Sequence, residues 1–139
     1  MQFFFAIISG VLIFVIGQII EKFILDPIQQ YKKVVGAVDN RLKFYSNILT
    51  SSGFGDELIV EITDSIRILS CELEASYKPI PLKLFLSKIK AVETNKDVAA
   101  AAKGLIFLSN AGGRRDSGVE KCENRIEQIR KLLKIELLD

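Results

Sequence analysis

FFFAIISGVLIFVIGQII, residues 3–20, contains no charged side chain and decides the architecture of this chain. An α-helix rises about 1.5 Å per residue, so about 20 apolar residues cross the hydrocarbon core of a bilayer. The run has 18 residues, and Phe23, Ile24 and Leu25 extend it past the charged pair Glu21 and Lys22. The pattern predicts a single transmembrane helix over residues 1–25.

Two other interpretations of this run are weaker. A signal peptide carries positive charge before its apolar stretch and small residues at its cleavage site. Only Met1 and Gln2 precede the run, and no A-x-A site follows it. A core helix of a soluble domain would keep a polar face, which three successive phenylalanines and the isoleucines after them do not leave. We therefore expect a retained membrane anchor.

The charges that flank the anchor predict its orientation. Positive residues stay in the cytoplasm, and those near the anchor lie on its C-terminal side: Lys22, Lys32, Lys33, Arg41 and Lys43. We expect the N-terminus outside and residues 26–139 in the cytoplasm. Cys71 and Cys122 fit a reducing compartment as small buried hydrophobes rather than as a disulfide.

Residues 26–139 show helical periodicity and no alternation long enough for a strand, so we expect an all-α cytoplasmic bundle of about four further helices. One helix is predicted over 28–49, and a second from Asp56 to just before Lys78-Pro79. Thr94 and Asp97 have the spacing of a capping box and open a fourth helix. The last helix is expected over about 116–138. A short third helix is predicted to place these residues on one side: Leu82, Phe85, Leu86, Ile89 and Val92.

A seven-residue repeat runs from the anchor into the helix over 28–49 and predicts a homo-oligomer. Outside the bilayer its rows are apolar or aromatic, with the alternating spacings of three and four that are typical of coiled coils. Within the bilayer, Gly10 and Gly17 share a row, and small residues let membrane helices approach closely. A lone anchor with incidental glycines is the alternative. The predicted oligomer seam is Gly10, Gly17, Ile24, Ile28, Tyr31, Val35, Val38, Leu42, Tyr45 and Leu49.

Asp26-Pro27 interrupts the long helix where it leaves the bilayer. Pro27 cannot donate a hydrogen bond to the carbonyl of Phe23 and crowds that carbonyl. Asp26 is a good N-cap and Pro27 a good first helical residue. We expect the helix to kink at Pro27, or to stop and restart there, so that the pair forms a hinge.

Charge is unevenly distributed along the bundle. Residues 51–80 carry six acidic and two basic side chains, whereas residues 81–103 carry five basic and two acidic ones. We favour two adjacent helices with complementary exposed faces. The alternative is a lysine surface that faces anionic lipid, because basic segments close to a membrane are attracted to its negative surface.

Catalytic chemistry is poorly represented in this chain. Histidine, the commonest general base and metal ligand, is absent, and neither a C-x-x-C pair nor a phosphate-binding glycine motif is present. We expect a non-enzymatic protein without cofactor or metal, and a net charge of +2 gives no reason to expect a nucleic acid duplex as partner. Arg114 and Arg115, in a glycine-flanked loop before a helix, are candidate anion-binding residues, although a solvated loop is the plainer interpretation.

Two stretches carry a resemblance: FVIGQIIEKFILDPI (14–28) and KGLIFLSN (103–110). With them the chain resembles uncharacterised small bacterial single-pass inner-membrane proteins that have a cytoplasmic helical domain. The resemblance implies a bacterial inner-membrane location and this topology, and it transfers no functional residue.

These observations predict a membrane-anchored homo-oligomer whose partners are the lipid bilayer, other copies and a protein. We expect an event on the bundle to reach the membrane helices through Asp26-Pro27, as in a membrane-perturbing effector of bacterial defence or stress response. The alternatives are a passive membrane-tethered adaptor that presents the bundle to a protein partner, and a nucleotide or anion sensor that uses Arg114 and Arg115.

Overall fold

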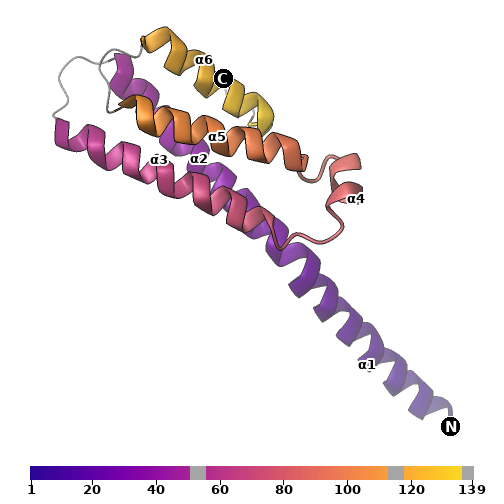
Figure 1. Ribbon diagram of the computed structural model, residues 1–139. Helices are drawn as coiled ribbons and strands as arrows, with labels where there is room; N and C mark the ends of the chain where they lie inside the picture. Colours follow the sequence, from indigo (N-terminus) through magenta and orange to yellow (C-terminus); the bar gives the residue numbers. More distant parts are fainter. Residues whose placement is uncertain (51–55, 113–117, 136–139) are drawn as a thin grey trace.

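The computed structural model describes residues 1–50, 56–112 and 118–135, and Figure 1 shows an all-helical chain in which one long helix protrudes from a bundle. The described residues contain no strand. The predicted all-α fold, with an apolar N-terminal helix followed by a bundle, is confirmed. The elements are α1 (Gln2–Ile20), η1 (Glu21–Leu25), α2 (Asp26–Thr50), α3 (Asp56–Tyr77), α4 (Lys83–Lys88), α5 (Asn95–Gly112) and α6 (Val119–Leu132).

Helix α1 stands apart from the rest of the molecule. Every residue from Phe3 to Ile20 is exposed, and α1 packs against no element other than the adjoining η1 among the described residues. The chain thus has one N-terminal helix that is long and apolar enough to cross a membrane. Because burial of apolar surface is the main force that holds a fold together, the exposed apolar surface of α1 is a surface that the rest of the described chain does not cover.

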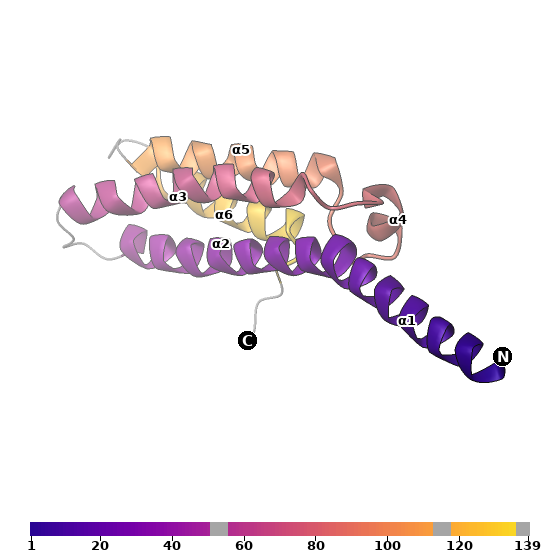
Figure 2. The same ribbon diagram turned by 90° about the horizontal axis from the view of Figure 1, so that it is seen from below.

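The junction between α1 and α2 is a π-helical turn rather than a break. The backbone N–H of Asp26 donates to the carbonyl of Glu21, five residues earlier, so η1 contains one residue more than an α-helical turn. A wider turn before Pro27 eases the crowding of the Phe23 carbonyl. Figure 2 shows the axis of α1 inclined to that of α2. A kink at Pro27 itself stays a prediction.

The bundle is formed by α2, α3, α5 and α6. Helix α3 packs between α2 and α5, α5 packs on α6, and α6 returns to α2, as the views in Figures 1 and 2 agree. The apolar stripe of each helix therefore has a partner in the same chain. The largest fully buried side chains come from all four helices: Tyr31, Leu42, Ile62, Ile66, Leu73, Leu105, Leu108, Ile129 and Leu133.

Several helix boundaries follow local chemistry that was visible in the sequence. Helix α3 has the predicted bounds, because Pro79 and Pro81 follow its last turn. The Thr94 hydroxyl accepts a hydrogen bond from the backbone N–H of Asp97 (3.3 Å) and donates to its carboxylate (2.6 Å). The predicted cap at the start of α5 is therefore confirmed.

The last helix is shorter than predicted. It ends at Leu132, because the N–H of Ile135 donates to the carbonyl of Arg130 and that of Lys134 to Lys131. This pair of hydrogen bonds is a Schellman motif, and it places Lys134 in the left-handed region at φ 49°. The reversal brings Leu133 into the core. The prediction that the helix continues beyond Leu132, which was based on the spacing of apolar residues, was therefore wrong.

The prediction of a one-sided third helix was also wrong. Helix α4 has only six residues, and a second Schellman motif with Lys90 at φ 58° turns the chain after it. Val92 reaches the core beyond that turn, and Leu86 reaches it from the helix. The other members of the predicted side are exposed: Leu82, Phe85 and Ile89.

Candidate functional site

Four members of the predicted oligomer seam lie inside the bundle of a single chain. Tyr31, Val38, Leu42 and Tyr45 are each exposed by 2% or less. Their side chains pack within the chain's own core and leave no surface for a second copy. This part of the predicted seam is corrected, because an apolar stripe with heptad spacing fits a neighbouring helix of the same chain as well as one from another copy.

The remaining seam residues divide between the protruding helix and the bundle. Gly10 and Gly17 are exposed in α1, and a Cβ atom built on either would meet nothing within 4 Å. Ile24, Ile28 and Val35 are partly buried, the last two against the core. The side chain of Leu49 lies outside the described residues. Association through the two glycines stays a prediction.

A polar cluster fixes the end of the bundle next to α1 and η1. The hydroxyl of Tyr31 donates to the Glu93 carboxylate (2.7 Å), and the hydroxyl of Tyr77 donates to the Glu93 backbone carbonyl (2.8 Å). The two tyrosine rings meet edge to face at 5.3 Å, and the Lys83 ammonium lies 4.9 Å from the centre of the Tyr77 ring. Burial, together with the negative charges of Glu93 and Asp97, raises the pKa of Tyr77.

This cluster ties the chain segment between α3 and α5 to the first turns of α2. In the sequence Tyr31 belongs to an apolar stripe, and its hydrogen bond to Glu93 was not predicted. Their separation of 62 residues leaves no local signal for the pair. The predicted hinge residues, Asp26 and Pro27, lie one turn before Tyr31, at the start of α2.

A second polar contact joins α2 to α6. The Asp39 carboxylate lies 3.4 Å from Nε of Arg130, and both side chains are about 16–17% exposed. Lys43, one turn later on α2, approaches the same carboxylate at 2.8 Å. When a charge pair is mostly removed from water, the loss of either partner lowers the stability of the fold, because the other charge is left unpaired. Nothing in the sequence marks Asp39 and Arg130 as a pair.

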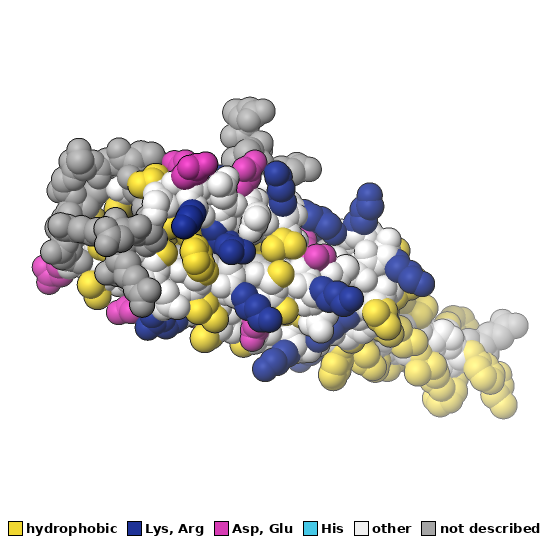
Figure 3. Space-filling model, turned by 45° about the horizontal axis from the view of Figure 1, so that its top comes forward, with side chains coloured by type: hydrophobic (Ala, Val, Ile, Leu, Met, Phe, Trp, Pro, Cys, Tyr) yellow, Lys and Arg dark blue, Asp and Glu magenta, His cyan; other side chains and the backbone are white. Residues whose placement is uncertain are grey.

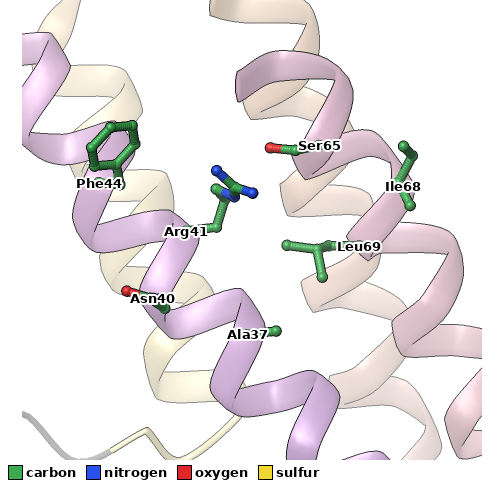
Figure 4. A pocket seen from close by; sticks show the side chains of 7 residues that line it. All are labelled: Ala37, Asn40, Arg41, Phe44, Ser65, Ile68 and Leu69. Atoms are coloured by element: carbon green, nitrogen blue, oxygen red, sulfur yellow. The ribbon is translucent and has the colours of Figure 1, made fainter. Parts of the chain in front are cut away.

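Between α2 and α3 lies an open groove of about 450 Å³. Figure 4 shows Arg41 extending from α2 into the space between the two helices, with Phe44 one turn beyond it and Ile68 on the α3 side. Phe44 and Ile68 are large apolar residues that remain exposed. The lining combines them with polar groups: Ala37, Asn40, Arg41, Phe44, Ser65, Ile68 and Leu69. The groove therefore offers apolar area beside a charged guanidinium group.

The two cysteines differ in accessibility. Cys122 is buried in α6, and burial raises the pKa of its thiol, an effect that the nearby Tyr45 hydroxyl partly offsets. Cys71 on α3 is exposed. A buried thiol of raised pKa is a poor nucleophile. The expectation that both cysteines are buried was therefore wrong for Cys71.

Other sequence predictions fall outside what the described residues can address. Arg114 and Arg115, the candidate anion-binding residues, lie outside the described ranges. Among residues that are described, no group of three or more metal-ligating side chains comes together. Helices α3 and α5 pack side by side, and charge complementarity between the acidic and basic segments stays a prediction.

The chain was compared with protein-family models, curated proteins and solved structures, and nothing in any of the three sets matches it.

Proposed function

We propose that this chain is a non-enzymatic single-pass membrane protein that holds a helical bundle against the cytoplasmic face of a bacterial inner membrane and presents it to a protein partner. The observation that carries the proposal is the contrast between α1, whose apolar residues are exposed all round, and a bundle whose apolar stripes are satisfied internally. The apolar surface of α1 is left for lipid to cover, whereas the bundle buries a core of its own.

The groove between α2 and α3 is the surface that we assign to the partner, and its occupant is an amphipathic helix. Phe44 and Ile68 offer exposed apolar area, and Arg41 offers a charged group at the same place. Aromatic and arginine side chains of this kind dominate the energetics of protein interfaces. A bundle that needs no second copy to bury its core favours this adaptor role over the oligomeric one.

The exposed Cys71 provides a direct test of anchoring and orientation. Full-length protein is expressed in bacteria, and a membrane-impermeant maleimide is added to spheroplasts or to inverted inner-membrane vesicles. We expect labelling only in inverted vesicles, and its loss in Cys71→Ser because Cys122 is buried. Labelling in spheroplasts would show that the bundle has the opposite orientation. Extraction of the protein by alkaline carbonate would refute the proposal that α1 spans the membrane.

A photo-crosslinking amino acid at Ile68 tests the groove. We expect a discrete adduct with another protein, which is lost when Arg41→Glu is added, while the same probe at Val60, also exposed on α3, gives none. An adduct that contains a second copy of this chain would favour self-association. Equal adducts from both probe positions would refute the groove as the binding surface.

The second candidate function is the membrane-perturbing homo-oligomer. The open surface at Gly10 and Gly17 supports it, because small residues allow a second α1 to pack closely. In this case induced expression depolarises cells, and Gly17→Leu abolishes both depolarisation and crosslinked oligomers. An unchanged membrane potential during expression of the wild-type chain would exclude this candidate.

A further inference from the structure

The three most exposed large apolar side chains of the described bundle lie in the segment around α4. Leu82 is 67% exposed, Leu84 85%, Phe85 61% and Ile89 57%. Four large apolar side chains within eight residues form a patch that a soluble surface rarely leaves open. We call Leu82, Leu84, Phe85 and Ile89 the α4 patch.

The α4 patch is held in place from beneath. Ile80, just before the patch in the chain, and Leu86, between Phe85 and Ile89, are buried in the core. Lys83 lies over the Tyr77 ring, and the Schellman motif at Lys90 fixes the exit of the chain. The exposed side chains therefore belong to an anchored segment whose inward residues already have partners, and their outward direction is part of the fold.

The position of this segment points to what covers the patch. Figures 1 and 2 both place α4 at the end of the bundle from which α1 emerges. The Tyr31–Glu93 hydrogen bond ties the chain just after α4 to a residue six positions beyond Leu25. Six residues of helix span about 9 Å, slightly more than the headgroup layer of about 5–8 Å on each side of the hydrocarbon core. A bilayer crossed by α1 thus has its surface close to α4.

The charges around the patch fit a phosphate-rich surface. Residues 78–90 contain four lysines and no acidic residue: Lys78, Lys83, Lys88 and Lys90. Figure 3 shows Lys and Arg side chains gathered on the bundle next to the base of the apolar α1. Apolar side chains flanked by lysines are the composition of segments that lie in the interface of an anionic membrane.

We propose that the α4 patch is a second membrane contact, which inserts its four apolar side chains into the interface of the bilayer while the neighbouring lysines bind anionic lipid phosphates. This proposal rests on the anchoring by α1 proposed above. The two contacts together fix the tilt of the bundle on the membrane, because α1 spans the bilayer and the α4 patch rests in its interface.

The absence of tryptophan from the chain allows a site-specific test. Three single Phe→Trp variants of the full-length protein are reconstituted in vesicles of phosphatidylcholine and phosphatidylglycerol: Phe14→Trp in α1, Phe85→Trp in α4 and Phe44→Trp in the groove. Brominated lipids then quench tryptophans that contact the membrane. We expect strong quenching of Phe14→Trp, clear quenching with a blue-shifted emission for Phe85→Trp, and neither for Phe44→Trp.

The three positions separate the two proposals. If Phe14→Trp is quenched while Phe85→Trp behaves like Phe44→Trp, anchoring stands and the α4 contact is refuted. If Phe14→Trp is not quenched, both are refuted. Quenching of Phe44→Trp equal to that of Phe85→Trp would also overturn the proposal, because the contact would then not be specific to α4.

The lipid charge supplies a second readout. Each lysine near an anionic surface contributes about a fivefold preference for the docked state. Quenching of Phe85→Trp should therefore fall in pure phosphatidylcholine and in the added Lys88→Gln and Lys90→Gln pair. The matched pair Lys103→Gln and Lys121→Gln, exposed elsewhere on the bundle, should leave it unchanged. Equal effects of the two pairs would refute the assigned role of the α4 lysines.

Discussion

Two glycines in the middle of helices, Gly36 and Gly104, should respond in opposite directions to the same substitution. A Cβ at Gly36 would meet nothing within 4 Å, so Gly36→Ala should raise the free energy of unfolding by about 1 kcal/mol through helix propensity alone. A Cβ at Gly104 would lie 2.8 Å from Cγ1 and 3.0 Å from Cδ1 of Ile129 on α6. Carbon atoms in contact normally lie about 3.5–4.0 Å apart.

The penalty at Gly104 should exceed the gain from propensity. Ile129 is fully buried, so a shift of its side chain away from a new Cβ would disturb its packing in the core. Overpacking of a core costs about 1–3 kcal/mol, against a propensity gain of about 1 kcal/mol. We therefore expect Gly104→Ala to lower the free energy of unfolding by up to about 2 kcal/mol, which is up to about thirtyfold in the unfolding equilibrium.

The buried Cys122 allows this comparison in the full-length chain. In a Cys71→Ser background and detergent micelles, the urea dependence of Cys122 labelling reports the opening of the bundle around α6. The expected order of midpoints is Gly36→Ala above the parent and Gly104→Ala below it. Equal stabilisation by the two substitutions would refute the close approach of α5 and α6 at Gly104.

Three further predictions concern the helix end and the polar contacts. Lys134→Gly should raise the midpoint of thermal unfolding, because glycine relieves about 1 kcal/mol of strain in the left-handed conformation. Lys134→Ala should leave the midpoint nearly unchanged. An equal rise from both variants would argue against the Schellman motif. Asp39→Asn should lower the free energy of unfolding by about 1–3 kcal/mol, because Arg130 loses its carboxylate. Lys43→Gln, at a more exposed pair, should lower it by less than about 1 kcal/mol. Urea titration measures both, and a larger loss from Lys43→Gln would contradict the greater weight given to the Asp39–Arg130 pair. Because the pKa of Tyr77 is raised in the folded chain, the stability that its neutral phenol provides should be complete below about pH 10 and be lost as the pH rises further; Tyr77→Phe should flatten this alkaline decline, and an unchanged slope would show that Tyr77 does not contribute to it.

The helices could largely be predicted from the sequence because their boundaries depend on local chemistry. The caps at Thr94 and Asp97 and the prolines after α3 act within a few residues. The end of α6 was missed because lysine occupies the left-handed position of its Schellman motif, where glycine is usual. Without that glycine, nothing distinguishes the turn from further helix.

The candidate site depended on pairings that no local pattern encodes. The stripe through Tyr31, Val38 and Leu42 correctly marked apolar, buried positions, but heptad spacing does not say whether the neighbouring helix belongs to the same chain. The partner of Tyr31 is 62 residues away. Three members of the α4 patch, Leu82, Phe85 and Ile89, were predicted on the same side of a short helix as residues that are buried. Only the arrangement in space separates its buried residues from its exposed ones.

The extra residue in η1 sets the direction in which each half of the long helix faces. A helix turns by about 100° per residue, so one additional residue in a turn rotates all that follows by about that angle. In an unbroken helix Gly17 and Tyr31 would lie within about 40° of each other, but with the π-helical turn they diverge by about 140°. If two chains met along their glycines, each bundle would therefore lie on the side of its helix that faces away from the other chain. The two chains could then associate or separate within the lipid without either bundle unfolding.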